Sequence, residues 1–232
     1  MIFGGFQQLS LIDYPGKICA IAFTIGCNFR CAFCHNKELV LPELIAKQPI
    51  ITEDDILTFL KTRIGKLEAL CITGGEPSLY DDLDKFLQKI KQLGFLIKLD
   101  TNGTNPTILS KILDAKLVDY IAMDIKAPLT TQDYNKITSV QVNLDNIKKS
   151  IELIKTKLSD YEFRTTVEPS LKEQDILQIA TYLAPAKKYF LQEFRTGNTL
   201  NPLYNSMKGL SRDELEKIKD KIKDNFEQIG VR

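Results

Sequence analysis

The sequence predicts an α/β protein built around a parallel β-sheet. Short apolar segments, typical of buried strands, alternate about six times with segments whose apolar residues recur at helical spacing. Capping and turn residues lie between these segments, and no linker or low-complexity stretch divides the 232 residues. Alternating strands and helices imply right-handed crossovers between parallel strands. Six such units form either an open doubly wound sheet or an incomplete barrel.

The first half of the chain begins with an N-terminal extension over residues 1–17. Within it, Pro15-Gly16 is a turn signal, so residues 8–12 are expected to form a small strand that turns into the first core strand. Thr52 caps a helix with an acidic first turn, and Asn105-Pro106 begins another. We expect strands at residues 18–23, 69–73 and 95–100, a helix after each, and irregular chain over 38–51.

The second half continues the alternation. We expect strands at 120–124, 161–167 and 189–194, with helices over 144–154 and 172–183. A longer polar connection covers 129–141. Ser211 and Glu214 have capping-box spacing, and Leu215, Ile218 and Ile222 give the last helix its apolar side. Residues 196–232 are therefore predicted to be a C-terminal loop and helix of a single domain that spans 1–232.

The composition is that of an ordinary globular protein. Hydrophobic residues make up 44% and charged residues 26% of the chain, and the formal net charge is +1. This balance gives no reason to expect a nucleic-acid or membrane-surface partner. The N-terminus has no signal-peptide pattern, and no apolar run approaches the length of a membrane helix. We expect a cytoplasmic protein, in which thiols stay reduced.

Three cysteines follow the first core strand, with the spacing Cys27-x3-Cys31-x2-Cys34. They could be free thiols, or they could bind zinc with His35 as the fourth ligand. They could also hold an iron–sulfur cube, which normally takes four cysteine ligands, so that three would leave one iron open. The other two cysteines of the chain lie in apolar runs and are interpreted as core residues.

Polar residues follow the other predicted strands as well. Because carboxyl ends of parallel strands meet at one edge of a sheet or barrel, these residues should gather there with the cysteines. Each group has a simpler explanation alone, such as a glycine turn or a structural ion pair, but their joint occurrence favours a site. The residues are Gly74, Gly75, Glu76, Asp100, Thr101, Asn102, Gly103, Asp124, Lys126, Arg164, Thr165, Thr166, Gln192 and Glu193.

The sequence at this point resembles the radical S-adenosylmethionine (SAM) superfamily. The cysteine motif, with Phe33 before its last cysteine, and the later Gly74-Gly-Glu-Pro77 occur in the right order. The segments Leu11-Ile-Asp-Tyr-Pro-Gly-Lys17, Asp100-Thr-Asn-Gly103 and Met123-Asp-Ile-Lys126 are similar to glycyl-radical-enzyme activases, in particular those of anaerobic ribonucleoside-triphosphate reductases. The resemblance implies an incomplete parallel (β/α)6 barrel of the radical SAM type.

The resemblance also implies the cofactors and their ligands. Cys27, Cys31 and Cys34 would hold one 4Fe–4S cluster, whose open iron would bind SAM. Gly74, Gly75 and Glu76 would lie at the methionine end of SAM, and Lys126 would pair with its carboxylate. Asp100, Asn102 and Asp124 would reach its methionyl or ribose part. Phe33 would lie near the adenine, and Thr165 would close the far side. No catalytic side chain is singled out.

The implied reaction is reductive cleavage of SAM to a 5′-deoxyadenosyl radical, which removes a hydrogen atom from a backbone glycine of a partner enzyme. The partners would be a glycyl radical enzyme, most simply anaerobic ribonucleotide reductase, and a flavodoxin- or ferredoxin-type electron donor. Two alternatives stay open. One is a radical SAM enzyme for a small molecule, like 7-carboxy-7-deazaguanine synthase, and the other is a zinc-binding module without radical chemistry.

Overall fold

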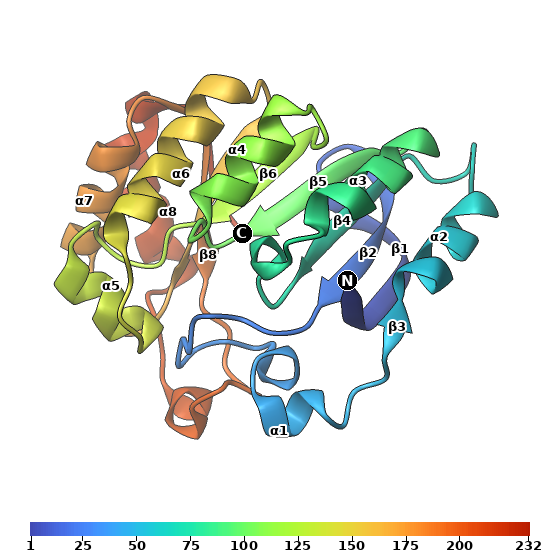
Figure 1. Ribbon diagram of the computed structural model, residues 1–232. Coiled ribbons are helices and arrows are strands. Elements are labelled where there is room, and N and C mark those ends of the chain that lie inside the picture. The colour runs from blue at the N-terminus through green and yellow to red at the C-terminus, as the bar shows by residue number, and fades with distance from the viewer.

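The fold, taken from a computed structural model that describes all 232 residues, is organised by one nine-stranded sheet (Figure 1). The strand order is β3-β1-β2-β4-β5-β6-β7-β8-β9. Strands β2 and β4 to β9 run parallel, whereas β1 is antiparallel to both β2 and β3. The strands are β1 (Ile2–Tyr14), β2 (Lys17–Thr24), β3 (Ile51–Thr52), β4 (Ala69–Gly74), β5 (Leu96–Thr101), β6 (Tyr120–Asp124), β7 (Tyr161–Val167), β8 (Ala186–Glu193) and β9 (Phe226–Val231).

Because β3 and β9 end the strand order and do not pair with each other, the sheet does not close. The predicted α/β class and the incomplete parallel barrel are confirmed. The helices are α1 (Pro42–Ile45), α2 (Glu53–Lys61), α3 (Leu83–Gln92), α4 (Pro106–Asp114), α5 (Thr131–Thr138), α6 (Leu144–Lys157), α7 (Glu173–Leu183) and α8 (Arg212–Ile222). None of them combines the length and apolar character needed to span a lipid bilayer.

Alternation along the strands divides the core into two parts. On β2, Ala20 and Ala22 belong to the large core of 52 residues that the helices cover. Cys19 belongs to a small cluster on the opposite face, together with Cys71 of β4 and Tyr120 of β6. The sulfur atoms of the two cysteines are 3.5 Å apart, and both residues are fully buried. The interpretation of these cysteines as core residues is therefore confirmed.

The connection at 129–141, which we predicted only as polar chain, contains helix α5. The Thr130 hydroxyl accepts a hydrogen bond from the Asp133 backbone N–H and caps the helix. Tyr134 and Ile137, three residues apart, turn its buried side to the core. Two apolar residues in a charged segment are a weak sequence signal, so only packing shows the helix.

Both ends of the chain carry more strand than predicted. The small strand expected at 8–12 is the middle of the 13-residue β1. The segment 196–232, predicted as loop and helix, ends in the additional strand β9, which pairs in parallel with β8. Strand β9 has only two buried residues, Phe226 and Val231. Its position is determined by backbone pairing with the edge of β8. A short sequence with so little apolar pattern does not predict that pairing.

Candidate active site

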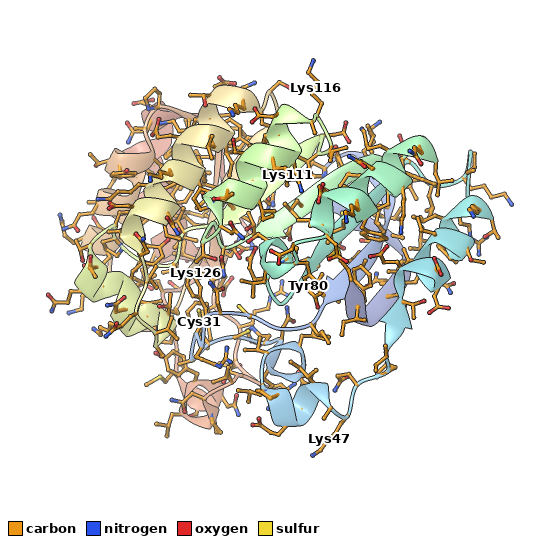
Figure 2. The ribbon with its side chains drawn as sticks, viewed as in Figure 1. Cys31, Lys47, Tyr80, Lys111, Lys116 and Lys126 are labelled. Atoms are coloured by element: carbon orange, nitrogen blue, oxygen red, sulfur yellow. The ribbon has the colours of Figure 1, made fainter.

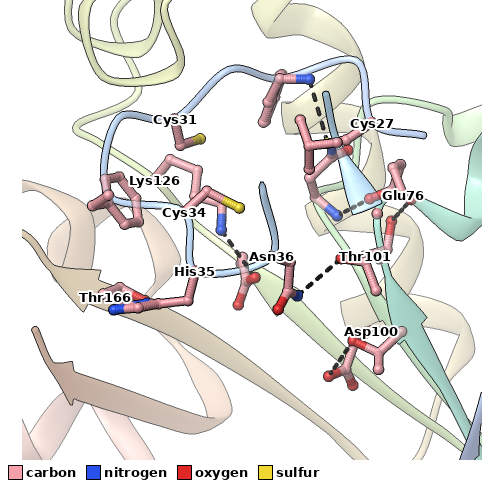
Figure 3. A pocket seen from close by; sticks show the side chains of 18 of the residues that line it. Cys27, Cys31, Cys34, His35, Asn36, Glu76, Asp100, Thr101, Lys126 and Thr166 are labelled. Atoms are coloured by element: carbon pink, nitrogen blue, oxygen red, sulfur yellow. Dashed lines mark hydrogen bonds and ion pairs between the residues drawn. The ribbon is translucent and has the colours of Figure 1, made fainter. Parts of the chain in front are cut away.

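A cavity of about 270 Å³ lies at the carboxyl ends of the parallel strands (Figure 3). The loop after β2 forms one wall, and the ends of β4 to β8 form the rest, as we predicted from the strand order. The lining residues are Cys27, Phe29, Cys31, Phe33, Cys34, His35, Asn36, Val40, Thr73, Gly74, Gly75, Glu76, Asp100, Thr101, Asn102, Asp124, Lys126, Arg164, Thr166 and Gln192.

The loop that carries the three cysteines is held by backbone contacts. Gly26 leaves β2 with a φ of 82°, in the left-handed region that favours glycine, and its N–H donates to the Leu39 carbonyl at 2.7 Å. The Arg30 guanidinium donates to the carbonyl oxygens of Cys27 and Phe29, at 2.6 and 2.8 Å. These contacts bend the loop back, so that its cysteines face the cavity.

The three thiols of the loop line the cavity together, and Figure 3 shows Cys31 and Cys34 directed into the same space. Burial raises the pKa of Cys27 to about 11 and that of Cys31 to about 12, and it also raises the pKa of Cys34. Without a ligand the thiols are therefore protonated at neutral pH. Binding of iron must displace these protons, as metal binding to thiols generally does.

The donor set fits an iron–sulfur cube better than a single zinc ion. Nowhere in the structure do three His, Cys, Asp or Glu side chains converge as ligands of one ion. In a cube, each thiolate binds a different iron, so the sulfur atoms need not converge on one point. His35, the fourth ligand of the zinc alternative, lines the cavity, but its Nε2 is hydrogen-bonded to the Arg195 carbonyl at 2.8 Å.

Gly74 and Gly75 bring the end of β4 against the cysteine loop. Gly74 has a φ of 110°, and a Cβ atom there would lie 2.6 Å from the Thr24 carbonyl oxygen. A Cβ atom on Gly75 would lie 1.9 Å from the Gly26 carbonyl oxygen. The family resemblance implied that these glycines lie at the methionine end of SAM. They do line the cavity, but their first requirement is the close approach of two backbone segments.

Replacement of Gly75 by alanine is expected to displace the cysteine loop. The added methyl group meets backbone, which cannot yield as a flexible side chain can, so overpacking of this kind costs about 1–3 kcal/mol or more. We expect a lower urea-unfolding midpoint and less iron bound per chain after reconstitution. Gly5→Ala is the matched control, because Gly5, like Gly75, does not have a positive φ, and a Cβ atom there would meet only side-chain atoms of Phe23 at 3.4 Å or more. Equal iron content in both variants would contradict this account.

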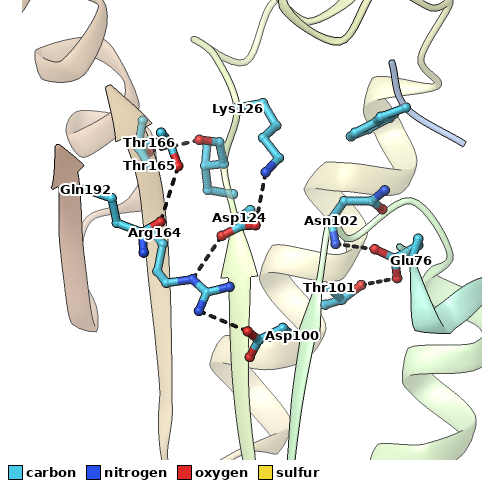
Figure 4. Close-up of polar contacts among 12 residues, drawn as sticks. Glu76, Asp100, Thr101, Asn102, Asp124, Lys126, Arg164, Thr165, Thr166 and Gln192 are labelled. Atoms are coloured by element: carbon cyan, nitrogen blue, oxygen red, sulfur yellow. Dashed lines mark hydrogen bonds and ion pairs between the residues drawn. The ribbon is translucent and has the colours of Figure 1, made fainter. Parts of the chain in front are cut away.

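Glu76 joins the ends of β4 and β5 beneath the cavity floor. Its carboxylate is buried and accepts hydrogen bonds from the Thr101 hydroxyl at 2.7 Å and from the Asn102 and Ser78 backbone N–H groups at 2.6 and 3.0 Å (Figure 4). Burial outweighs these bonds and raises its pKa. Glu76 thus lines the cavity as predicted, but three donors of the protein already fix its position.

A row of alternating charges crosses the ends of β5, β7 and β6 (Figure 4). The Arg164 guanidinium contacts Asp100 through Nη1 at 3.1 Å and Asp124 through Nε at 2.9 Å. Burial alone would raise the pKa of both carboxyl groups, but Arg164 and the neighbouring lysines outweigh it, so both pKa values are lowered. Lys98 and Lys126 complete the row at its two ends.

Lys126 extends this row towards the cysteines, and Figure 2 labels it above Cys31. Its Nζ lies 3.0 Å from the Asp124 carboxylate and 5.9 Å from the centre of the Phe33 ring. Burial would lower the pKa of Lys126, but the Asp124 carboxylate outweighs it, and the pKa is raised. Lys126 is therefore a permanent cation in the wall of the cavity, and it still has N–H donors to offer a ligand.

Thr165 does not line the cavity, and neither do Gly103 and Glu193, which we also expected at this rim. Thr165 is fully buried, and its hydroxyl donates to the Ile125 carbonyl at 2.9 Å and accepts from Tyr189 at 2.8 Å. Its neighbours Arg164 and Thr166 line the cavity instead, with Gln192 of β8. Side chains alternate along a strand, so Thr166, two residues after Arg164, lies on the same face of β7 as Arg164. The position of the charged Arg164 at the site could therefore have indicated Thr166 rather than Thr165.

Comparison with known proteins agrees with this arrangement. The sequence profile of the Radical SAM superfamily matches residues 21–183. This chain belongs to the radical SAM superfamily. The cofactors of the superfamily are a 4Fe–4S cluster and SAM, as the family resemblance implied. A SAM-bound structure of this type, that of Streptococcus suis SuiB, superposes with a TM-score of 0.68 at 16% identity, over 91% of this chain and 49% of SuiB. It supports the fold.

Two relatives of this chain have different activities in their names. A protein of Methanocaldococcus jannaschii, provisionally named a glycyl-radical enzyme activating enzyme, is 30% identical over 98% of this chain and 94% of its own length. The GTP 3′,8-cyclase of Aquifex aeolicus is 26% identical over 75% of this chain and 55% of the cyclase.

Proposed function

We propose that this radical SAM protein is a glycyl-radical-enzyme activase. The observation that carries the proposal is the relative named as such an enzyme, because the match runs over almost the whole length of both chains. The match to the GTP cyclase leaves nearly half of that enzyme without a counterpart. Its partner, as the sequence resemblance implies, is an anaerobic ribonucleotide reductase, and its electron donor is a flavodoxin- or ferredoxin-type protein.

In this proposal the loop after β2 holds the cluster through Cys27, Cys31 and Cys34, whose thiols are the only cysteine side chains in the cavity. Lys126 lies beside them, and its positive charge offsets the charge of the thiolates. The cluster and SAM together supply the one-electron cleavage of the sulfonium that yields the hydrogen-abstracting radical. The protein supplies position and a partly closed surrounding for that step.

Residues at the ends of several strands make the remaining contacts with SAM. Lys126 pairs with the carboxylate of SAM, and Glu76 and the backbone at Gly74 and Gly75 lie at its amino end. Asp100, Asn102 and Asp124 supply acceptors for ribose hydroxyls or the methionyl part. Phe33, held in the cysteine loop and buried, offers an apolar ring for the adenine.

The test is an anaerobic incubation of the reconstituted protein with dithionite, SAM and a candidate anaerobic ribonucleotide reductase. Electron paramagnetic resonance should show a glycyl radical that requires all four components. The same mixture without the reductase should show any idle formation of 5′-deoxyadenosine. Deoxyadenosine without a glycyl signal, together with consumption of a small molecule such as GTP, would favour the alternative of a small-molecule radical SAM enzyme.

A further inference from the structure

A buried acid lies next to Arg164, further from the carboxyl ends of the strands. Glu162 precedes Arg164 by two residues on β7, and Tyr161 and Phe163 on either side of it belong to the large core, so Glu162 faces away from the helices. Only 1% of Glu162 is exposed, and it does not line the cavity. Its carboxylate is 3.9 Å from the Arg164 Nη1 atom. It therefore competes with Asp100, 3.1 Å away, for the same guanidinium group.

A second arginine, Arg232 at the end of β9, holds this acid. Its Nη1 and Nη2 atoms donate to the two carboxylate oxygens of Glu162 at 3.0 and 3.1 Å, a bidentate pair. The Tyr120 hydroxyl donates to one of these oxygens at 2.9 Å. The Arg232 backbone N–H donates to the Leu191 carbonyl, and the guanidinium stacks 3.4 Å from the centre of the Phe190 ring. Glu162 is thus satisfied from β6 and β9 without Arg164.

This arrangement leaves Arg164 available to the cavity. Its Nε and Nη1 atoms are held by Asp124 and Asp100, whereas its Nη2 atom has no partner in the protein (Figure 4). Because the side chain lines the cavity, Nη2 keeps two N–H donors for a ligand. Loss of Arg232 would leave Glu162 as a buried charge, and Arg164 is the other cation within 4 Å. A turn of Arg164 towards Glu162 would break its contact with Asp100 and withdraw Nη2.

We infer that Arg232 is a positioning residue of the SAM site, because it binds Glu162 and so keeps the free donors of Arg164 directed at SAM. Strand β9, which the sequence did not predict, thereby acts on the site through two side chains without lining the cavity. The inference rests on the assignment of the cavity to SAM. It does not depend on the identity of the hydrogen donor, so it applies to an activase and to a small-molecule enzyme alike.

The experiment is a double-mutant comparison of SAM binding. Arg232→Met should raise the Kd of the cluster-loaded protein for SAM about tenfold, the effect of losing one charged hydrogen bond. Addition of Glu162→Gln should restore the affinity, because a neutral amide does not attract Arg164 as a carboxylate does. A merely structural role predicts the opposite, since the second substitution would add to the damage of the first. Anaerobic equilibrium dialysis with radiolabelled SAM measures the affinities.

A second measurement does not need the cluster. The NMR signal of the Arg164 Nε–H group in the metal-free protein should shift in Arg232→Met and return in the double variant. Arg212→Met is the matched control, because Arg212 donates to the Val231 carbonyl of β9 at 3.3 Å and makes no contact with Glu162. It should bind SAM as the wild type does.

The urea-unfolding midpoint shows which variants are folded. If Arg232→Met does not fold, Arg232→Lys takes its place, because it keeps the charge but loses the bidentate pair and should also bind SAM more weakly than the wild type. Wild-type affinity in the Arg232 variant, or weaker binding in the double variant than in the single one, would overturn the inference alone. A wild-type protein that does not bind SAM would overturn the assignment of the cavity as well.

Discussion

Replacement of Cys31 by alanine is expected to reduce the iron of the reconstituted protein from about four atoms per chain to nearly none. The cavity contains three cysteines and no fourth that could replace a lost ligand. Two remaining thiolates cannot hold a cube against loss to solvent, so formation of 5′-deoxyadenosine from SAM should be abolished as well. Iron and sulfide analysis, the visible absorption of the cluster and product chromatography measure these effects.

Cys71→Ala is the control for this prediction. Cys71 is as deeply buried as Cys31, but it lies on the opposite side of β4 from the helices, in contact with Cys19, and does not line the cavity. This variant should keep its iron and its SAM cleavage, with a modest loss of stability from the smaller side chain. A full complement of iron in Cys31→Ala, or loss of iron in Cys71→Ala, would refute the assignment of the ligands.

Replacement of Arg164 by methionine is expected to lower the free energy of unfolding by about 3 kcal/mol at pH 7. Arg164 is mostly buried, with 12% of its side chain exposed, and its guanidinium is the contact that Asp100 and Asp124 share. Methionine has a similar length but leaves both carboxylates without that cation. Removal of one partner of buried ions usually costs more than the intact pair contributes, because the remaining charge stays desolvated.

The pH dependence of this difference provides a second measurement. The pKa values of Asp100 and Asp124 are lowered in the folded protein, so their stabilisation is fully present above the unfolded pKa of about 4. It is lost as the pH falls through the folded values. The gap between wild type and Arg164→Met should therefore narrow below about pH 4. Urea unfolding of the metal-free protein measures it, with the exposed Arg195→Met as control. A gap below about 0.5 kcal/mol at pH 7 would show that the ion row is not stabilising.

The sequence by itself determined the order of strands and helices, the place of the cysteine motif after the first parallel strand, and the gathering of polar residues at one rim. These follow from local signals and from one topological rule. Apolar runs, caps such as Thr52 and glycine turns predict the secondary structure of the segments in which they occur. The carboxyl ends of parallel strands must meet at the same edge, so Cys34, Asp100 and Lys126 could be placed together without coordinates.

Only the tertiary structure decided which side chains face the cavity and which contact one another. A shift of one residue along a strand turns a side chain to the other face. Of the three β7 residues expected at the rim, Arg164 and Thr166 therefore line the cavity, whereas Thr165, to which a SAM contact was assigned, does not. Arg164 joins two carboxylates of different strands, and Gly75 lies against the backbone of Gly26. Both depend on the spacing of segments about 40 to 60 residues apart. Strand β9 likewise exists because β8 offers it a partner. Long-range packing and register are properties of the assembled sheet, and no local pattern contains them.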